Sequence, residues 1–351
     1  MAPSLSRRLV SGPDDLWTLL VRVVLMPLAM VYLFIVVVKN ALYDAGLLRP
    51  RSVGAAVVSV GNVTVGGTGK TPFVVLLARM GVEAGRKVGV VSTGHGAEAS
   101  ADGLSEEVML LRERCPDAEI VVAPDKLPGA REAVGRGCNL IILDDALHAR
   151  HLQRDMEVIL VDARRPFGSG WLLPAGGLRE PPSSISRADV LVLSHADAVS
   201  DDRRDEVVHR LRTYNRGASL LEVRHVPLGW RSVAGGELIP PESLAGREVF
   251  AFCGIAAPEG FRHTLESLGA RVTGLSAFSD HHAFETADLA KVRAEAGTSL
   301  LICTEKDARK IGRLPGNEDV ACLLIDVVLE GDFPPLPEVT AATVGVQAEA
   351  H

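Results

Sequence analysis

Residues 59–72 combine the residue types and the order that phosphate binding requires. Glycines stand at positions 61, 66, 67 and 69, the apolar run 55–60 precedes them, and a lysine and a threonine follow. Glycines let backbone N–H groups turn inward, and the N-terminus of a following helix attracts anions. A strand, a Gly-rich turn and a helix in this order predict a phosphate-binding loop for ATP. The residues expected to hold the nucleotide are Val65, Gly66, Gly67, Thr68, Gly69, Lys70 and Thr71.

Two residues of this loop have separate expected tasks. Lys70 would reach the β- and γ-phosphates as a catalytic cation, and the Thr71 hydroxyl would ligate Mg²⁺. One position departs from the usual spacing, which has a glycine five residues before Gly69, where this chain has Thr64. The alternative is a Gly-rich turn without a ligand, and Gly-Lys-Thr after two further glycines disfavours it.

Asp144 and Asp145 directly follow the apolar segment 140–143. A hydrophobic strand that ends in an acidic residue is typical of the second element of nucleotide-binding sites, in which a carboxylate holds Mg²⁺. Many strands end in aspartate, so the prediction that Asp144 and Asp145 bind Mg²⁺ depends on the phosphate-binding loop upstream.

Residues 167–182 are rich in glycine and proline and contain the pair Arg179-Glu180. The Arg179 guanidinium could contact phosphate oxygens, and the Glu180 carboxylate could contact the metal. The alternative is a surface turn with an exposed charge pair.

Adjacent histidines, His281 and His282, lie in a Ser-Asp-His-His segment, and 304–307 reads Thr-Glu-Lys-Asp. Adjacent side chains rarely point the same way, and no cysteine or third histidine stands at ligand spacing, which disfavours zinc. A histidine paired with a carboxylate in acid–base chemistry is the favoured interpretation.

Apolar segments alternate with helical patterns along most of the chain. This alternation predicts an α/β fold, a P-loop NTPase-like doubly wound parallel sheet followed by a second, smaller α/β domain. Such sheets bind ligands at the carboxyl ends of their strands, where Lys70, Asp144, Asp145 and Asp162 lie. The predicted strands of the first part are 55–60, 87–92, 119–123, 139–143, 158–161 and 190–193, and those of the second are 249–253, 271–274, 299–303 and 321–326.

Composition excludes some functional classes. A net charge of −7, a pI of about 5.8 and 4 % aromatic residues argue against nucleic-acid binding. The cysteines form no C-x-x-C pair, and most lie in or beside apolar runs, which fits a reducing compartment. No obligate protein partner is evident.

The segment 16–38 is almost wholly apolar, and arginines or lysines flank it on both sides. Its uninterrupted part, 23–38, is shorter as a helix than the ~30 Å hydrocarbon core. It lacks a small-residue cleavage site, which disfavours a signal peptide. We expect a helix that lies in or dips into the cytoplasmic face of the inner membrane, with a true span as the alternative.

These features predict five regions along the chain. They are an N-terminal apolar membrane-associated helix (1–50), a P-loop domain (51–224), which the resemblance described next implies is a kinase domain, a connector (225–245), a smaller C-terminal α/β domain (246–335) and a flexible tail (336–351).

With these motifs the chain resembles the tetraacyldisaccharide 4'-kinase family over nearly its whole length. The segments that carry the resemblance are 61–72, 172–181, 253–256, 280–282 and 304–307. The resemblance implies transfer of a phosphoryl group from ATP, with Mg²⁺, to the 4'-hydroxyl of an acylated glucosamine disaccharide, a lipid A precursor that resides in the membrane. It also implies two α/β/α domains with the active site in the cleft between them.

The departures from the family pattern cluster near the implied catalytic base. The family's Ser-Arg-Gly-Tyr-Gly is here Ser-Thr-Gly-His-Gly (92–96), and its Gly-Asp-Glu-Pro corresponds to Ser-Glu-Glu-Val (105–108). Its Asp-Asp-Gly-Phe/Leu-Gln-His corresponds to Asp-Asp-Ala-Leu-His-Ala (144–149). In the family the aspartate of this segment is the base and pairs with a histidine of the Asp-His-His segment, so the resemblance implies that Glu106 could replace it. Either His281 or His282 could be the paired histidine, and His281 is the favoured one. A divergent active kinase is favoured over a paralogue with another acceptor.

A different class remains as the second hypothesis, a membrane-associated switch ATPase that also carries Gly-Gly-x-Gly-Lys-Thr. Such proteins usually have a lysine just before the two glycines, where this chain has Val65, and they tend to use an amphipathic rather than a strongly apolar helix. Both features favour the kinase.

Overall fold

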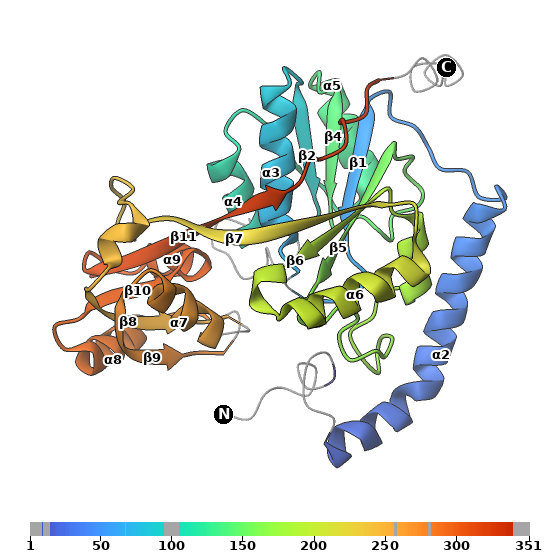
Figure 1. Cartoon of the computed structure of the whole chain (residues 1–351). Coiled ribbons are helices and arrows are strands. Elements are labelled where there is room, and N and C mark those ends of the chain that lie inside the picture. Colours follow the sequence, from blue (N-terminus) through green and yellow to red (C-terminus); the bar gives the residue numbers. More distant parts are fainter. Residues whose placement is uncertain are drawn as a thin grey trace. The chain divides into compact units, whose positions relative to one another are not determined.

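The computed structural model describes residues 9, 15–66, 68–94, 105–255, 258–279 and 282–339, and for Glu106 the backbone alone. The chain forms two compact units, which are described separately. Unit 1 comprises Met1–Arg224 and Leu329–His351, and unit 2 comprises His225–Val328. Element labels follow Figure 1.

Unit 1 is built on a parallel sheet in which β1 is central (Figure 1). The spatial order of its strands is β3-β2-β4-β1-β5-β6-β7, and each neighbouring pair is parallel. The strands are β1 (Ala56–Gly61), β2 (Val88–Ser92), β3 (Glu119–Val122), β4 (Leu140–Asp144), β5 (Met156–Asp162), β6 (Val190–Ser194) and β7 (Ser219–Ser232).

Helices cover both faces of this sheet. Val58 and Val60 of β1 pack with Phe73 and Leu77 of α3, whereas Val57 of the same strand packs in the cluster that contains α5. Successive side chains of a strand point to opposite faces, so α3 and α5 lie on opposite sides, and the predicted doubly wound α/β fold is confirmed. The helices are α3 (Lys70–Glu83), α4 (Glu106–Arg114), α5 (Lys126–Gly135) and α6 (Asp201–Tyr214).

Unit 2 is the predicted smaller α/β domain. Its parallel strands have the order β11-β10-β8-β9. Strand and helix residues form two buried apolar clusters, one that contains Phe252, Leu289 and Ile311 and another that contains Leu265. The elements are β8 (Glu248–Cys253), α7 (Pro258–Ser267), β9 (Arg271–Ala277), α8 (Thr286–Ala296), β10 (Leu300–Thr304), α9 (Glu305–Ile311) and β11 (Val320–Glu330).

The boundaries between the units differ from the predicted ones. The region 225–245, expected to be a connector, belongs to unit 2, where Trp230 and Ile239 exchange backbone hydrogen bonds. The chain returns to unit 1 at Leu329, and Phe333 and Leu336 pack against the unit 1 core. The small domain therefore ends before 335, and the predicted tail begins with packed residues; its part from 340 on lies outside the described residues.

The N-terminal apolar segment forms one long helix, α2 (Leu16–Asp44), that is capped by Asp15. Among the described helices it alone has the length and composition to cross a membrane, and its best 18-residue window has a mean hydropathy of 2.6. Most of its large apolar side chains are exposed, among them Val24 at 77 % and Phe34 at 68 %. A narrow stripe that includes Ala29, Val36 and Asn40 is buried.

Candidate active site

The Gly-rich loop connects β1 to α3 and has the backbone conformation of an anion site. Gly66 and Gly69 have φ of 123° and 80°, which residues with a Cβ rarely adopt. Gly69 caps α3 without a side-chain hydrogen bond, so the first N–H groups of α3 are left to a ligand. The Thr68 hydroxyl is buried and has no hydrogen-bond partner among the described residues. Gly67 lies outside the described residues.

Lys70 is the first residue of α3, and its ammonium lies between two polar side chains. Nζ donates a hydrogen bond to Asn62 Oδ1 at 2.9 Å and lies 3.7 Å from Asp145 Oδ1. Asn62 is itself held by donating from Nδ2 to the Thr64 carbonyl at 2.6 Å. Thr71 follows in the first turn of α3 and is half-buried. Asn62 and Asp145 therefore orient the lysine side chain.

Asp144 and Asp145 end β4 beside the Gly-rich loop, because Val60 of β1 is in register with Asp144. Asp144 is 3 % exposed, and its burial raises the pKa of that carboxyl, although the charges of Lys126 and Lys70 oppose the rise. Asp145 adopts a left-handed conformation with φ of 55°. Burial alone would raise the pKa of Asp145, but the positive charges of Lys70 and Arg179 lower it below its usual value.

Arg179 is bound to the Gly-rich loop through its backbone and to Asp145 through its side chain. Its N–H donates to the Val63 carbonyl at 2.8 Å, and Val65 N–H donates to Gly177 at 2.6 Å. Its Nη1 donates to Asp145 Oδ2 at 2.6 Å. The structure thus brings together Lys70, Asp145 and Arg179, which the sequence placed on three separate segments.

Glu180 is the site residue whose surroundings differ most from the prediction. Its carboxylate is 2 % exposed and accepts hydrogen bonds at Oε2 from Arg187 Nη2 at 2.8 Å and from Asn40 Nδ2 at 3.2 Å. Burial would raise the pKa of Glu180, but Arg187 and its hydrogen bonds lower it. These partners compensate the buried charge at Oε2. Glu180 Oε1 is buried without a hydrogen-bond partner among the described residues, so the metal-ligand role of Glu180 stays a prediction.

Sequence reasoning missed two residues near the aspartates, Lys126 and His148. Lys126, the first residue of α5, is 2 % exposed and donates from Nζ to the Val91 carbonyl at 3.1 Å. Burial lowers the pKa of Lys126, while Asp144 and Asp145 favour its charged form. Burial also lowers the pKa of His148, against the pull of Asp145. A lysine just after the predicted strand 119–123 stands at a carboxyl end, which was the available signal.

The predicted acid–base residues fall largely outside the described residues. Glu106 is the first residue of α4, a helix that Ser105 caps by accepting from Val108 N–H at 3.3 Å, but its side chain is not described. His281 is not described. Its neighbour His282 lies 2.9 Å from Asp288 through Nε2 and stacks on Phe278 with ring centroids 4.7 Å apart.

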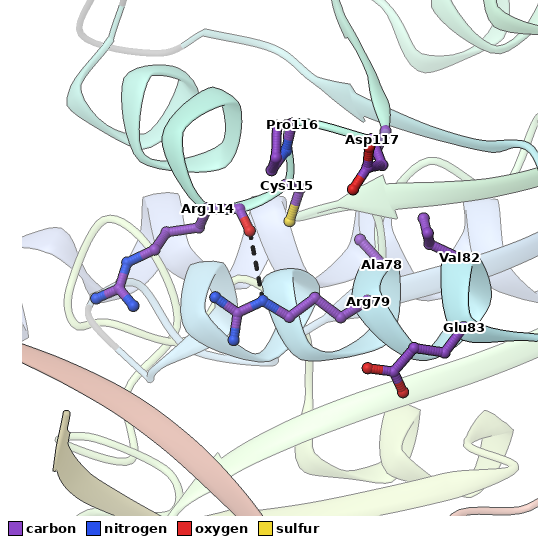
Figure 2. A pocket seen from close by; sticks show the side chains of 9 residues that line it. Ala78, Arg79, Val82, Glu83, Arg114, Cys115, Pro116 and Asp117 are labelled. Carbon is purple, nitrogen blue, oxygen red and sulfur yellow. Dashed lines mark hydrogen bonds between the residues drawn. The ribbon is translucent and has the colours of Figure 1, made fainter.

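A hollow of about 210 Å³ lies elsewhere on unit 1, between the C-terminal half of α3 and the turn before β3. Figure 2 shows Arg79 donating from Nε to the Arg114 carbonyl there, at 3.4 Å. Because phosphates would bind at the opposite end of α3, this hollow is not part of the candidate site.

The donor set at the Gly-rich loop suits Mg²⁺ and a triphosphate. Thr71 and the two aspartates supply oxygen atoms, which hard cations prefer. Asp145 Oδ1 is buried without a hydrogen-bond partner among the described residues, as is the Thr68 hydroxyl. Lys70 and Arg179 supply positive charge for phosphate oxygens.

Comparisons with known proteins identify the family of this chain. The model of the tetraacyldisaccharide-1-P 4'-kinase family matches residues 21–340. The tetraacyldisaccharide 4'-kinases of Anaeromyxobacter dehalogenans (strain 2CP-C) and Syntrophus aciditrophicus (strain SB) are 40 % and 36 % identical to the chain. These matches cover 78 % and 82 % of this chain and 77 % and 84 % of the relatives. The crystal structure of an "apo" form of LpxK from Aquifex aeolicus in complex with ATP is 28 % identical, with a TM-score of 0.69, and the match covers 88 % of this chain and 95 % of that one.

Proposed function

This chain belongs to the tetraacyldisaccharide 4'-kinase family, and we propose that it transfers the γ-phosphoryl group of ATP to the 4'-hydroxyl of an acylated glucosamine disaccharide, a lipid A precursor. The observation that carries the proposal is the convergence of Lys70, Arg179 and Asp145 beside the Gly-rich loop. Two cations and a carboxylate around a phosphate cradle suit phosphoryl transfer, in which catalysis consists mainly of positioning and charge stabilisation.

We assign the charges to distinct tasks. Lys70 and Arg179 stabilise the negative charge that develops on the transferring phosphoryl oxygens. Thr71, Asp144 and Asp145 would hold Mg²⁺, which, when bound, neutralises phosphate charge and orients the triphosphate. The low pKa of Asp145 keeps this carboxylate ionised at neutral pH, as a ligand for a cation must be.

The acceptor hydroxyl needs a base, and we propose Glu106 for this role. Its carboxylate accepts the proton of the 4'-hydroxyl while the oxygen bonds to the γ-phosphorus and the bond to the bridging oxygen of ADP breaks. His281 would orient this carboxylate. Glu106 begins α4, and the positive end of a helix favours the ionised form of a carboxylate at its first turn.

The site of action that we propose is the cytoplasmic face of the inner membrane. Exposed apolar side chains along α2, among them Leu16, Val24 and Phe34, suit contact with lipid. The acyl chains of the substrate stay in the bilayer, so the kinase must bring its phosphate site to the headgroups.

Transfer of ³²P from γ-labelled ATP to the disaccharide lipid, in detergent micelles, tests the proposal. We expect a labelled lipid that carries the transferred phosphate on its 4'-hydroxyl. ATP hydrolysis that proceeds at the same rate without lipid, with no labelled product, would support a switch ATPase instead. A labelled product from another lipid acceptor alone would support the paralogue.

A further inference from the structure

Tyr32, on the apolar helix α2, contacts the active-site loop directly. We propose that Tyr32 is a positioning residue for Arg179, so that the helix offered to the membrane also sets the geometry of the phosphate site. The inference rests on the proposed kinase function and adds to it a role for α2 beyond attachment.

The Arg179 peptide is held from two sides. On one side its N–H donates to the Val63 carbonyl at 2.8 Å, which ties it to the start of the Gly-rich loop. On the other side its carbonyl accepts a hydrogen bond from Tyr32 Oη at 2.8 Å. A carbonyl only accepts, so the phenol is the donor. With its backbone fixed at both ends, the side chain can present Nη1 to Asp145 at 2.6 Å.

A second contact from α2 holds the next residue of the same loop. Asn40 donates from Nδ2 to Glu180 Oε2 at 3.2 Å, and Glu180 is also bound by Arg187 at 2.8 Å. Tyr32 and Asn40 are eight positions apart, close to two helical turns, so they project from the same side of α2. Arg179 and Glu180 are therefore both attached to one face of this helix.

The segment that follows Asp145 is attached to α2 as well. Lys39 donates from Nζ to the His148 carbonyl at 3.1 Å, and Arg150 donates from Nη1 to the Asn40 carbonyl at 3.0 Å. Arg150 also donates from Nη2 to Asp44 at 2.7 Å. The helix thus contacts both loops that supply the Arg179–Asp145 pair.

Attachment to a membrane does not need this arrangement. An apolar helix would bind lipid without polar contacts to the loops of the candidate site. The hydrogen bonds instead end on Arg179, Glu180 and His148. Displacement of a catalytic group by about 1 Å can slow an enzyme by ~10²-fold, so small shifts of α2 would lower the rate of phosphoryl transfer.

Steady-state kinetics of the full-length kinase in detergent micelles test the inference. Tyr32→Phe removes only the hydroxyl, and we expect kcat to fall about tenfold while the KM for ATP changes less than about twofold. Tyr43→Phe is the matched control, because it removes the same atom from the same helix, where Tyr43 offers its ring to Arg150. Its kinetics should equal those of the unmodified protein.

A double-mutant cycle separates positioning from general stability. If Tyr32 acts through Arg179, Tyr32→Phe will have no further effect on kcat in the Arg179→Ala background. A tenfold loss that persists in that background overturns the inference, and so does Tyr32→Phe activity equal to that of Tyr43→Phe. If Tyr32→Phe does not fold, as judged by thermal unfolding, Asn40→Ala replaces it in the same kinetic assay and the same double-mutant cycle, with the same expected and contradicting results. Absence of lipid product from the unmodified protein would instead overturn the proposed function.

Discussion

Arg179 donates a hydrogen bond from Nη1 to Oδ2 of Asp145 at 2.6 Å. The other oxygen of the same carboxylate faces Lys70 Nζ at 3.7 Å, so one anion orients two cations, one from the start of α3 and one from the loop before Pro182. Asp145 directly follows β4 and has a left-handed backbone, with φ of 55°. Asp145 therefore lies next to the two cations that we propose for binding phosphate oxygens.

Replacing Lys70 by alanine should abolish transfer. The ammonium is the cation at the N-terminus of α3, and its loss leaves developing phosphoryl charge uncompensated, so we expect kcat/KM to fall by about 10³-fold or more. The labelled-ATP assay measures this loss. Lys291→Ala, at an exposed lysine of α8, is the control and should keep full activity. Substantial transfer by Lys70→Ala would contradict the assignment of the phosphate site.

Glu106→Gln should separate binding from chemistry. The amide cannot accept the hydroxyl proton, so we expect kcat to fall by ~10²-fold or more while the affinity for ATP, measured by calorimetry, stays the same. Glu113→Gln changes a glutamate near the other end of α4 and should have little effect. Full activity of Glu106→Gln would show that another group is the base.

Glu180→Gln tests whether this residue acts as a structural ion-pair partner or as a metal ligand. Loss of the buried charge leaves Arg187 without its ionic partner, and we expect the free energy of unfolding to fall by about 1–3 kcal/mol. The Mg²⁺ concentration for half-maximal activity should not change. A large rise in that concentration, with the free energy of unfolding unaltered, would show that Glu180 is a metal ligand. Asp145→Asn, assayed in parallel, should raise it.

Asp145 should make the free energy of unfolding depend on pH. Its folded pKa is lowered below the usual value by Lys70 and Arg179, so the ionised form contributes stability above the unfolded pKa of about 3.9. That contribution is lost as the pH falls through the folded pKa. Urea unfolding should therefore show a gap between the unmodified protein and Asp145→Asn that is constant from about pH 5 to 7 and closes below about pH 4. The exposed Asp117→Asn controls for the lost charge, and a gap that widens in acid would contradict the assignment.

Charges on the exposed side of α2 should release the protein from lipid. Val24 and Phe34 are 77 % and 68 % exposed, and burying each in a bilayer stabilises attachment by about 1.5–3 kcal/mol. The double substitution of both residues by aspartate should weaken binding to anionic vesicles by at least about 10²-fold in a sedimentation assay. Leu238→Asp places a charge on an exposed leucine of unit 2 and should leave vesicle binding intact. Equal binding by all three proteins would exclude α2 as the membrane element.

The sequence by itself determined the class of fold, and it predicted the phosphate site. An apolar run, spaced glycines and Lys70-Thr71 are contiguous, and the physics of a strand, a turn and a helix N-terminus acts over a few residues. The prediction for Asp144 and Asp145 was also local, because four consecutive apolar residues indicate a strand and the residues that follow mark its carboxyl end. The alternation of apolar segments with helical patterns can also be recognised from neighbouring residues, so the doubly wound sheet could be predicted, and it is confirmed.

Only the tertiary structure decided which partner each charged residue has. Glu180 is bound by Arg187 and by Asn40, which is 140 positions away, and Tyr32 reaches Arg179 across 147 positions. Nothing in the spacing of these residues predicts such contacts, because they depend on how α2 packs within unit 1. The position of Lys126 just after a predicted strand was a local signal, but its burial beside Asp144 follows from the order β3-β2-β4 in the sheet. Short sequence patterns predict the secondary structure and the chemistry of one segment. Which other segment supplies its hydrogen-bond and ion-pair partners depends on long-range packing.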